Sequence, residues 1–284
     1  MVRIAVTGAS GRLGRLVAAG LLRRVSADQL ILISRSPLRS VSGVTVRYGD
    51  FDRPETLRDA FHGADRALVI STLGSRDAVA AHRAAFENAA RGGVGNIVYT
   101  SVLNPVPDNP FPPAATHLHS EADLAATGVA WTVLRNALYA DLRVDIAPAY
   151  VRSGQWVTNI GAGAHAFVAR ADCSAAAVAV LTGEGHEGHR YDITGPELVD
   201  ATGYLALLNR LADQPVDRID VDDEGYERYR TGFVNEPAHA GTFELFTGTG
   251  RAIRTGWLNV LSDDVRRLTG HTPTALQDMP PFTR

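Results

Sequence analysis

Short apolar runs, most of them separated by stretches of helical periodicity, dominate the first half of the chain. After the first run, Leu13, Leu16, Val17 and Leu21 recur at helical spacing. Strands that alternate with helices are typical of a parallel sheet covered by helices on both faces. We therefore predict an α/β fold whose doubly wound parallel sheet contains six strands. These strands are expected at residues 2–6, 30–34, 44–48, 67–71, 96–100 and 131–135.

The pattern changes after about residue 150, where the alternation weakens and glycine becomes frequent. We predict one more helix over 170–181 and one more strand over 191–193. We expect a main domain over 1–150 and a smaller, interwoven C-terminal lobe over 151–284, with residues 170–195 returning to the main domain. The segment 105–113 holds five prolines, which favours a loop at the ligand-binding edge of the sheet.

Three glycines, Gly8, Gly11 and Gly14, follow the first predicted strand. The first permits a tight turn, the second lets a phosphate approach the backbone, and the third lets the helix pack closely on the strand. The N-terminus of the following helix offers free N–H groups to a pyrophosphate. This context predicts a dinucleotide site in a Rossmann-type fold. The other residues of the loop that we assign to this site are Ser10, Arg12 and Leu13.

The end of the second predicted strand indicates which dinucleotide is bound. Folds that bind NAD place an acidic residue there for the ribose 2′-hydroxyl. This strand ends in Ser34, Arg35 and Ser36, without a carboxylate. A guanidinium can bind the 2′-phosphate of NADP through charge-assisted hydrogen bonds, with Arg12 nearby in the glycine loop. We therefore predict NADPH as the cofactor; the alternative for Arg35 is a solvated loop cation.

Composition excludes several other classes of protein. The 284 residues are 45% hydrophobic and 21% charged, with a formal net charge of -3, and arginines are interspersed with acids, so neither nucleic acid nor an anionic membrane is an expected partner. The first residues enter a strand directly, without a signal-peptide pattern, and we expect a cytoplasmic protein. Cys173 is alone, and His186 and His189 are three residues apart rather than the four that a helical zinc motif needs. We predict no metal site.

Further motifs identify the chain as similar to the NmrA-like, atypical short-chain dehydrogenase/reductase family. Besides the glycine loop, they are residues 48–52, 99–101, 120–124, 134–139, 170–172, 185–191 and 268–274. The resemblance covers nearly the whole chain, weakens between about 200 and 260, and departs at Ala122. It implies a bound nicotinamide cofactor, with Asp50 and Phe51 beside the adenine and with Ser71, Thr72 and Leu73 along the middle of the cofactor. Thr100 and Ser101 are assigned to the same site.

The chain contains no lysine, because its 28 basic residues are all arginine. The Tyr-x-x-x-Lys pair of most short-chain dehydrogenases is therefore impossible. Reduction of a quinone suits such a site, since the product oxygen has a pKa on the order of 10 and needs no strong acid. Strand order and the family pattern place His117, Asn136 and Tyr139 near the nicotinamide. We take His117 as the first candidate for catalysis; its alternative is a structural hydrogen bond, and Tyr139 could equally be a packing aromatic.

Three functions remain open at this point. The first is an NADPH-dependent reductase of a quinone or another flat, electrophilic aromatic or carbonyl compound. The second is a redox-sensing regulator that binds NADP without turnover, and the third is a non-redox enzyme, such as an isomerase or dehydratase, on the same fold. A small-molecule substrate is expected in the first and third cases, and a homo-oligomer is compatible with all three.

Overall fold

A seven-stranded parallel sheet forms the centre of the computed structural model, which describes residues 1–38, 42–72, 75–233 and 240–279. Its strand order is β10-β6-β5-β4-β1-β2-β3, so the chain starts in the middle and winds outward in both directions, which confirms the doubly wound α/β prediction. The strands are β1 (Ile4–Val6), β2 (Leu30–Ser34), β3 (Thr45–Tyr48), β4 (Arg66–Val69), β5 (Asn96–Val102), β6 (Ala130–Asn136) and β10 (Arg190–Ile193).

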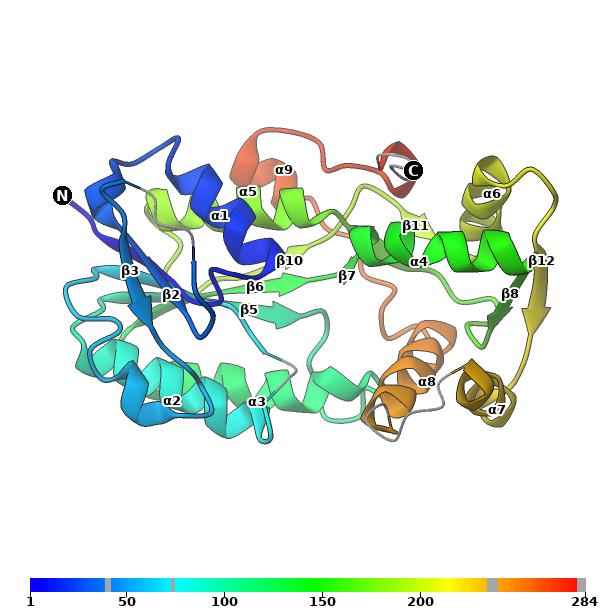
Figure 1. The fold of residues 1–284 in the computed structure, drawn as a ribbon, viewed down its shortest axis with the longest axis horizontal. Coiled ribbons are helices and arrows are strands. Elements are labelled where there is room, and N and C mark those ends of the chain that lie inside the picture. The colour runs from blue at the N-terminus through cyan, green and yellow to red at the C-terminus, as the bar shows by residue number, and fades with distance from the viewer. Residues whose placement is uncertain (39–41, 73–74, 234–239, 280–284) are drawn as a thin grey trace.

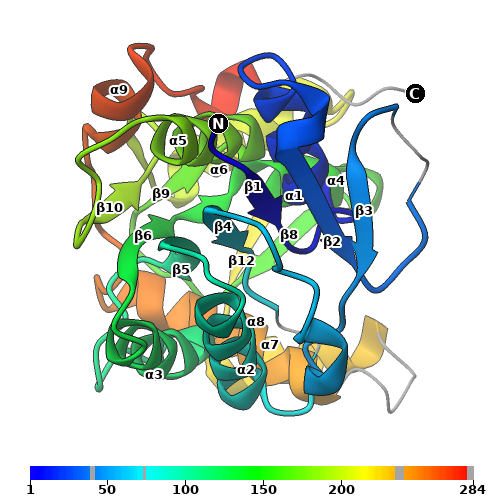
Figure 2. The ribbon, with the colours of Figure 1, turned by 90° about the vertical axis from the view of Figure 1, so that its left-hand side faces the viewer.

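Helices cover both faces of this sheet, as Figures 1 and 2 show. One face carries α1 (Arg12–Leu21), α5 (Arg170–Thr182) and α9 (Asp264–Thr269), and the other carries α2 (Ala78–Arg91) and α3 (Pro112–Ala126). All five residues of β2 are buried, as expected for a strand covered on both sides, whereas the edge strand β3 alternates. Val2, which we included in the first strand, is exposed and precedes β1.

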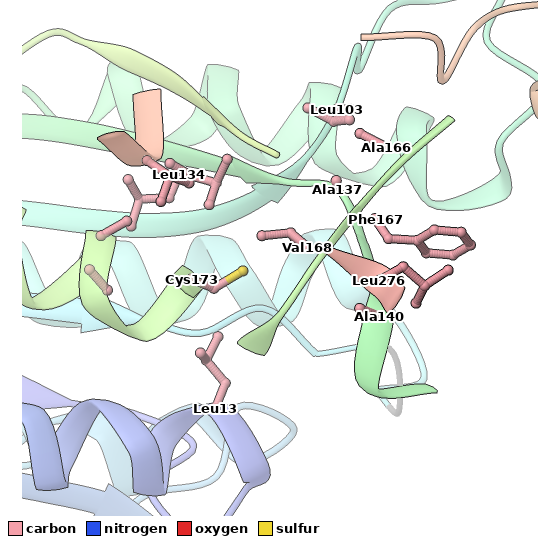
Figure 3. Packing of buried hydrophobic residues seen from close by; sticks show 14 of the residues in the cluster. Leu13, Leu103, Leu134, Ala137, Ala140, Ala166, Phe167, Val168, Cys173 and Leu276 are labelled. Carbon is pink, nitrogen blue, oxygen red and sulfur yellow. The ribbon is translucent and has the colours of Figure 1, made fainter. Parts of the chain in front are cut away.

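The apolar stripe of α1 is narrower than its sequence pattern indicated. Leu13, Val17 and Leu21 are buried, but Leu16 is 40% exposed. In Figure 3, Leu13 lies beside α5, on which the buried Cys173 is found. Burial raises the pKa of the Cys173 thiol well above its ordinary value. This cysteine is therefore a small core residue, as predicted.

The proline-rich segment is only partly a loop. The prediction of a loop over 105–113 was wrong at its end, because Pro112 and Pro113 form the first turn of α3. Proline is tolerated there, since the first N–H groups of a helix have no partner within the helix. Before the helix, the Asn109 side chain accepts a hydrogen bond from the backbone N–H of Phe111, at 2.9 Å.

A second group of elements packs at the carboxyl ends of β5 and β6 (Figure 1). It contains a three-stranded sheet of order β11-β9-β7 and a pair formed by β12 and β8. Because β7 follows β6 directly while β10 returns to the main sheet, the two parts are interwoven. The elements are β7 (Leu138–Tyr139), α4 (Ala140–Ser153), β8 (Gln155–Thr158), β9 (His165–Val168), β11 (Leu198–Val199), α6 (Ala201–Leu211), β12 (Asp217–Asp220), α7 (Asp223–Phe233) and α8 (Ala240–Arg254).

Candidate functional site

One groove collects most of the residues that the sequence assigned to the cofactor. It lies at the carboxyl ends of β1, β2, β3 and β4, the edge at which open α/β sheets bind ligands. Eight assigned residues line it, namely Gly8, Ser10, Gly11, Arg35, Asp50, Phe51, Ser71 and Thr72. Leu73 lies outside the described residues.

The glycine loop has the backbone geometry that a phosphate site requires. Gly8 has a φ of +59°, a conformation that residues with a side chain rarely adopt. A Cβ on Gly14 would lie 2.3 Å from the carbonyl oxygen of Gly8, so only glycine lets the helix approach the turn this closely. Gly11 is the N-cap of α1 and also lines the groove. The positive end of the α1 dipole therefore faces the groove, where it favours an anion.

The end of β2 carries one exposed guanidinium and no carboxylate. Arg35 lines the groove, and no described residue forms an ion pair with it. The Ser34 hydroxyl is already engaged locally, because it donates to the carbonyl oxygen of Ser36 at 2.8 Å. The guanidinium of Arg12 forms an ion pair with Asp145 on α4 instead of lining the groove. Arg35 is thus the cation that this end of the groove presents.

Thr100 and Ser101 lie behind the groove rather than in it, and both are buried. The Thr100 hydroxyl oxygen accepts a hydrogen bond from the backbone N–H of Ser71, at 2.9 Å. Ser101 donates to Glu121 on α3, at 2.8 Å. Thr100 therefore supports a groove residue, and the Ser101 hydroxyl is used within the protein core.

Glu121 is the centre of a buried ionic network. This carboxylate, only 5% exposed, accepts hydrogen bonds from Arg135 on β6 and from Arg190 on β10, at 2.7 and 3.0 Å. Burial acts to raise its pKa, but the hydrogen bonds from Arg135, Ser101 and Arg190 outweigh burial and hold the pKa below its ordinary value. The network joins α3 to three neighbouring strands of the sheet.

The structure separates the three predicted catalytic residues into two places. His117 is 2% exposed, and its Nδ1 lies 2.9 Å from the hydroxyl of Tyr99 in the core between the sheet and α2 and α3. Burial lowers the pKa of His117 to about 3, so its imidazole is neutral near pH 7. Asn136 and Tyr139, by contrast, come together at the end of β6, where the Asn136 amide donates to the Tyr139 hydroxyl at 3.3 Å.

Arg170, to which we assigned no role, completes the Asn136–Tyr139 cluster. Its guanidinium carbon lies 4.5 Å from the centre of the Tyr139 ring, and its Nη1 is 3.8 Å from a carboxylate oxygen of Asp141. Burial raises the pKa of Tyr139, so the phenol keeps its proton at neutral pH. The side-chain oxygen of Asn136 is buried and has no partner among the described residues. The end of β6 thus places an unsatisfied acceptor next to a protonated phenol.

A narrow crevice of about 30 Å³ lies within the C-terminal lobe. It is lined by His165 and Arg143, and by the aromatic residues Trp156, Phe167, Tyr204, Tyr226 and Phe246. Trp156 and Phe246 thus lie at its boundary. His165 is 4% exposed, neither ring nitrogen has a partner among the described residues, and burial lowers its pKa to about 3.

The residues that the structure describes form no candidate metal site. Among them, no three His, Cys, Asp or Glu side chains come together as a possible metal site. His186 lies with its Nδ1 3.0 Å from the Tyr191 hydroxyl. Among the residues that the structure describes, no helix is long and apolar enough to cross a membrane.

Comparison with known proteins shows the family to which the chain belongs. Residues 8–184 match the model of a family described as NAD(P)H-binding. Quinone oxidoreductase 2 of Escherichia coli is 29% identical over 97% of this chain and 96% of its own length. An NAD(P)H azoreductase of Xenophilus azovorans is 26% identical over 81% of this chain and 80% of its own.

Solved structures agree with these sequence matches. The E. coli NADPH-dependent quinone oxidoreductase in complex with NADPH superimposes with a TM-score of 0.90 at 30% identity, covering 97% of each chain. The triphenylmethane reductase of Citrobacter in complex with NADP(H) gives 0.87 at 32% identity, covering 97% of this chain and 98% of its own. The chain therefore belongs to the NAD(P)H-binding family, and within it to the NAD(P)H-dependent oxidoreductases.

Proposed function

We propose that this protein is an NADPH-dependent reductase that transfers hydride to a quinone or a similarly flat, electrophilic aromatic compound. The observation that carries the proposal is the groove itself, in which a glycine loop and a helix N-terminus lead to the exposed Arg35 with no carboxylate at the end of β2. The relatives described above, a quinone oxidoreductase, an azoreductase and a triphenylmethane reductase, support a flat acceptor.

In this proposal, Arg35 binds the 2′-phosphate of NADPH and the glycine loop binds the pyrophosphate. An arginine suits this task, because its planar fork of donors matches phosphate oxygens. Asp50 and Phe51 stand beside the adenine, and Ser71 and Thr72 line the middle of the cofactor. Each of these residues lines the groove.

The Asn136–Tyr139 cluster is the proposed polar end of the acceptor site. The Tyr139 phenol is protonated and can donate a hydrogen bond to a carbonyl oxygen that gains electron density. A quinol oxygen has a pKa on the order of 10, so this weak donor or water suffices as the proton source. His117, buried and bonded to Tyr99, supplies no proton directly in this proposal.

Steady-state oxidation of NADPH tests this function. We expect turnover with several naphthoquinones and benzoquinones, weaker turnover with azo or triphenylmethane dyes, and very slow turnover with simple ketones. A calorimetric titration with NADPH is made on the same sample. Tight binding without oxidation by any acceptor would identify a redox-sensing NADP-binding protein instead, whereas absence of binding would contradict the interpretation of the groove.

A further inference from the structure

Three consecutive backbone N–H groups at the end of β4 are each bound by a side chain from a different part of the fold. The N–H of Ile70 donates to the Thr7 hydroxyl oxygen at 3.0 Å, and that of Ser71 donates to Thr100 at 2.9 Å. The N–H of Thr72 donates to Nε2 of His82 on α2, at 3.0 Å. We call Ile70, Ser71 and Thr72 the cofactor strip, because all three line the groove.

These three bonds set the orientation of the cofactor strip. Backbone N–H groups are good anion donors, and an N–H that is tied to the protein interior is no longer offered to the groove. Thr7, Thr100 and His82 are themselves buried, so their acceptors are held in place by packing. The strip therefore presents a fixed surface to the groove, and three acceptors in the interior determine that surface.

His82 differs from the two threonines because its acceptor depends on the tautomer of the ring. A backbone N–H can only donate, so Nε2 of His82 must be unprotonated and the ring proton must be on Nδ1. Nδ1 lies 2.9 Å from the Ser120 hydroxyl and 3.2 Å from that of Tyr99. Ser120 donates in turn to the carbonyl oxygen of Thr116, at 2.9 Å, which leaves its oxygen free to accept from Nδ1.

The second histidine of this core completes the same arrangement. The Tyr99 hydroxyl can donate to Nδ1 of His117, at 2.9 Å. His117 thereby holds Tyr99, which packs against His82 with ring centres 5.4 Å apart. His117, which the sequence suggested for catalysis, is therefore connected to the cofactor strip only indirectly, through Tyr99 and His82.

We propose that His82 is a positioning residue for the cofactor, acting through the N–H of Thr72, with its tautomer set by Ser120 and Tyr99. The proposal rests on the assignment of the groove to the dinucleotide. It requires no contact between His82 and the cofactor, and none of the residues involved takes part in hydride or proton transfer. Sequence gives little sign of this role, because His82 is one histidine within an alanine-rich helix.

Two substitutions at this position separate the hydrogen bond from packing. His82→Leu removes the acceptor, whereas His82→Gln can place an amide oxygen near the position of Nε2. We expect His82→Leu to raise the Kd and KM for NADPH by up to about tenfold, the effect of losing one buried hydrogen bond, with little change in kcat. His82→Gln should restore both constants to within about threefold. His119→Leu, the same change at an exposed histidine on α3, is the matched control.

Amide hydrogen exchange at Thr72, measured without cofactor, gives a readout that does not depend on activity. We expect slow exchange in the unmodified protein and in His82→Gln, and fast exchange in His82→Leu. If His82→Leu does not fold, Thr100→Val provides the equivalent test at the N–H of Ser71. Equal loss of NADPH affinity in the Leu and Gln variants, or unchanged exchange and affinity in a folded Leu variant, would overturn the proposal. A protein that shows the exchange pattern but binds no NADPH would contradict the proposed function and the assignment of the groove, while confirming that His82 holds the N–H of Thr72.

Discussion

At the scale of single residues, we propose that Arg35 selects the nicotinamide cofactor. In that role, Arg35→Asp would remove a charge-assisted contact to the 2′-phosphate and add a repulsion. We expect NADPH affinity to fall by one to two orders of magnitude while NADH affinity stays the same or improves. Calorimetric titration with both cofactors measures the change, with Arg24→Asp, on an exposed arginine outside the groove, as the control. Equal affinities for NADPH and NADH in the unmodified protein would refute this role of Arg35.

Proton supply is a second property of single residues. If the reduced acceptor oxygen is only weakly basic, Tyr139→Phe and His117→Ala should each lower kcat/KM for quinones far less than the factor of roughly 10²–10⁴ that follows loss of a general acid. Tyr139→Phe should cost more with a simple ketone, whose product alkoxide is a strong base. The measurement is kcat/KM over acceptors of graded basicity. A loss of several orders of magnitude with every quinone would show that a dedicated acid exists.

Sequence alone predicts the residues whose role is imposed by the backbone. Gly8 and Gly14 belong to this group, because a positive φ and a missing Cβ leave a visible pattern. His82 and Arg170 do not, since their roles depend on partners that are distant in the chain, such as Thr72 and Tyr139. His117 shows the converse: the sequence suggested it for catalysis, but it lies within α3, which begins at Pro112, and only tertiary packing reveals that Tyr99 holds its ring.

At the scale of elements, the ionic network of Glu121 attaches α3 to the sheet. Glu121→Ala leaves Arg135 and Arg190 without their shared carboxylate in a largely buried place. Breaking a buried pair in this way typically costs about 3–5 kcal/mol of stability. The exposure of the Arg190 side chain to solvent should place this case at the low end of the range. Urea unfolding measures the cost, and Glu197→Ala, at an exposed position, should change stability by less than about 0.5 kcal/mol.

Elements of the main sheet were predictable because buried strands leave long apolar runs. Each of the six expected strands is present, with ends shifted by a few residues. The lobe was not predictable in the same detail, because β7 and β11 have only two residues each and pair with β9 across more than 25 residues of chain. Such short strands are defined by tertiary pairing rather than by local periodicity. The start of α3 was misjudged for a local reason, namely that proline is compatible with a first helical turn.

At the scale of the whole molecule, three buried neutral histidines make stability dependent on pH. Burial lowers the pKa of His82 to about 4 and those of His117 and His165 to about 3. In the unfolded chain each returns to about 6.5. Between these values the unfolded state binds more protons than the folded state, so stability falls as pH decreases below about 6.5. Well below 6.5, each histidine contributes a slope of about 1.4 kcal/mol per pH unit.

Urea unfolding between pH 6.5 and 5 measures the contribution of the histidines. Burial acts to raise the pKa values of the carboxylates Glu121 and Asp223, but hydrogen bonds outweigh burial and lower both. Protonation of these two groups therefore weakens the fold only below their ordinary pKa values of 4.5 and 3.8.

His165→Leu removes one of the three histidines, namely the one whose ring nitrogens have no partner among the described residues. We therefore expect this variant to lose up to about a third of the slope, because His82, His117 and the partly buried His186, whose pKa burial also lowers, keep their contributions. It should keep near-native stability at pH 7.5, since the described His165 makes no hydrogen bond that the substitution would remove. His119→Leu, at an exposed position on α3, should leave the slope unchanged. A slope that is the same in His165→Leu and in the unmodified protein would mean that His165 is protonated, or bound by water, in the folded state.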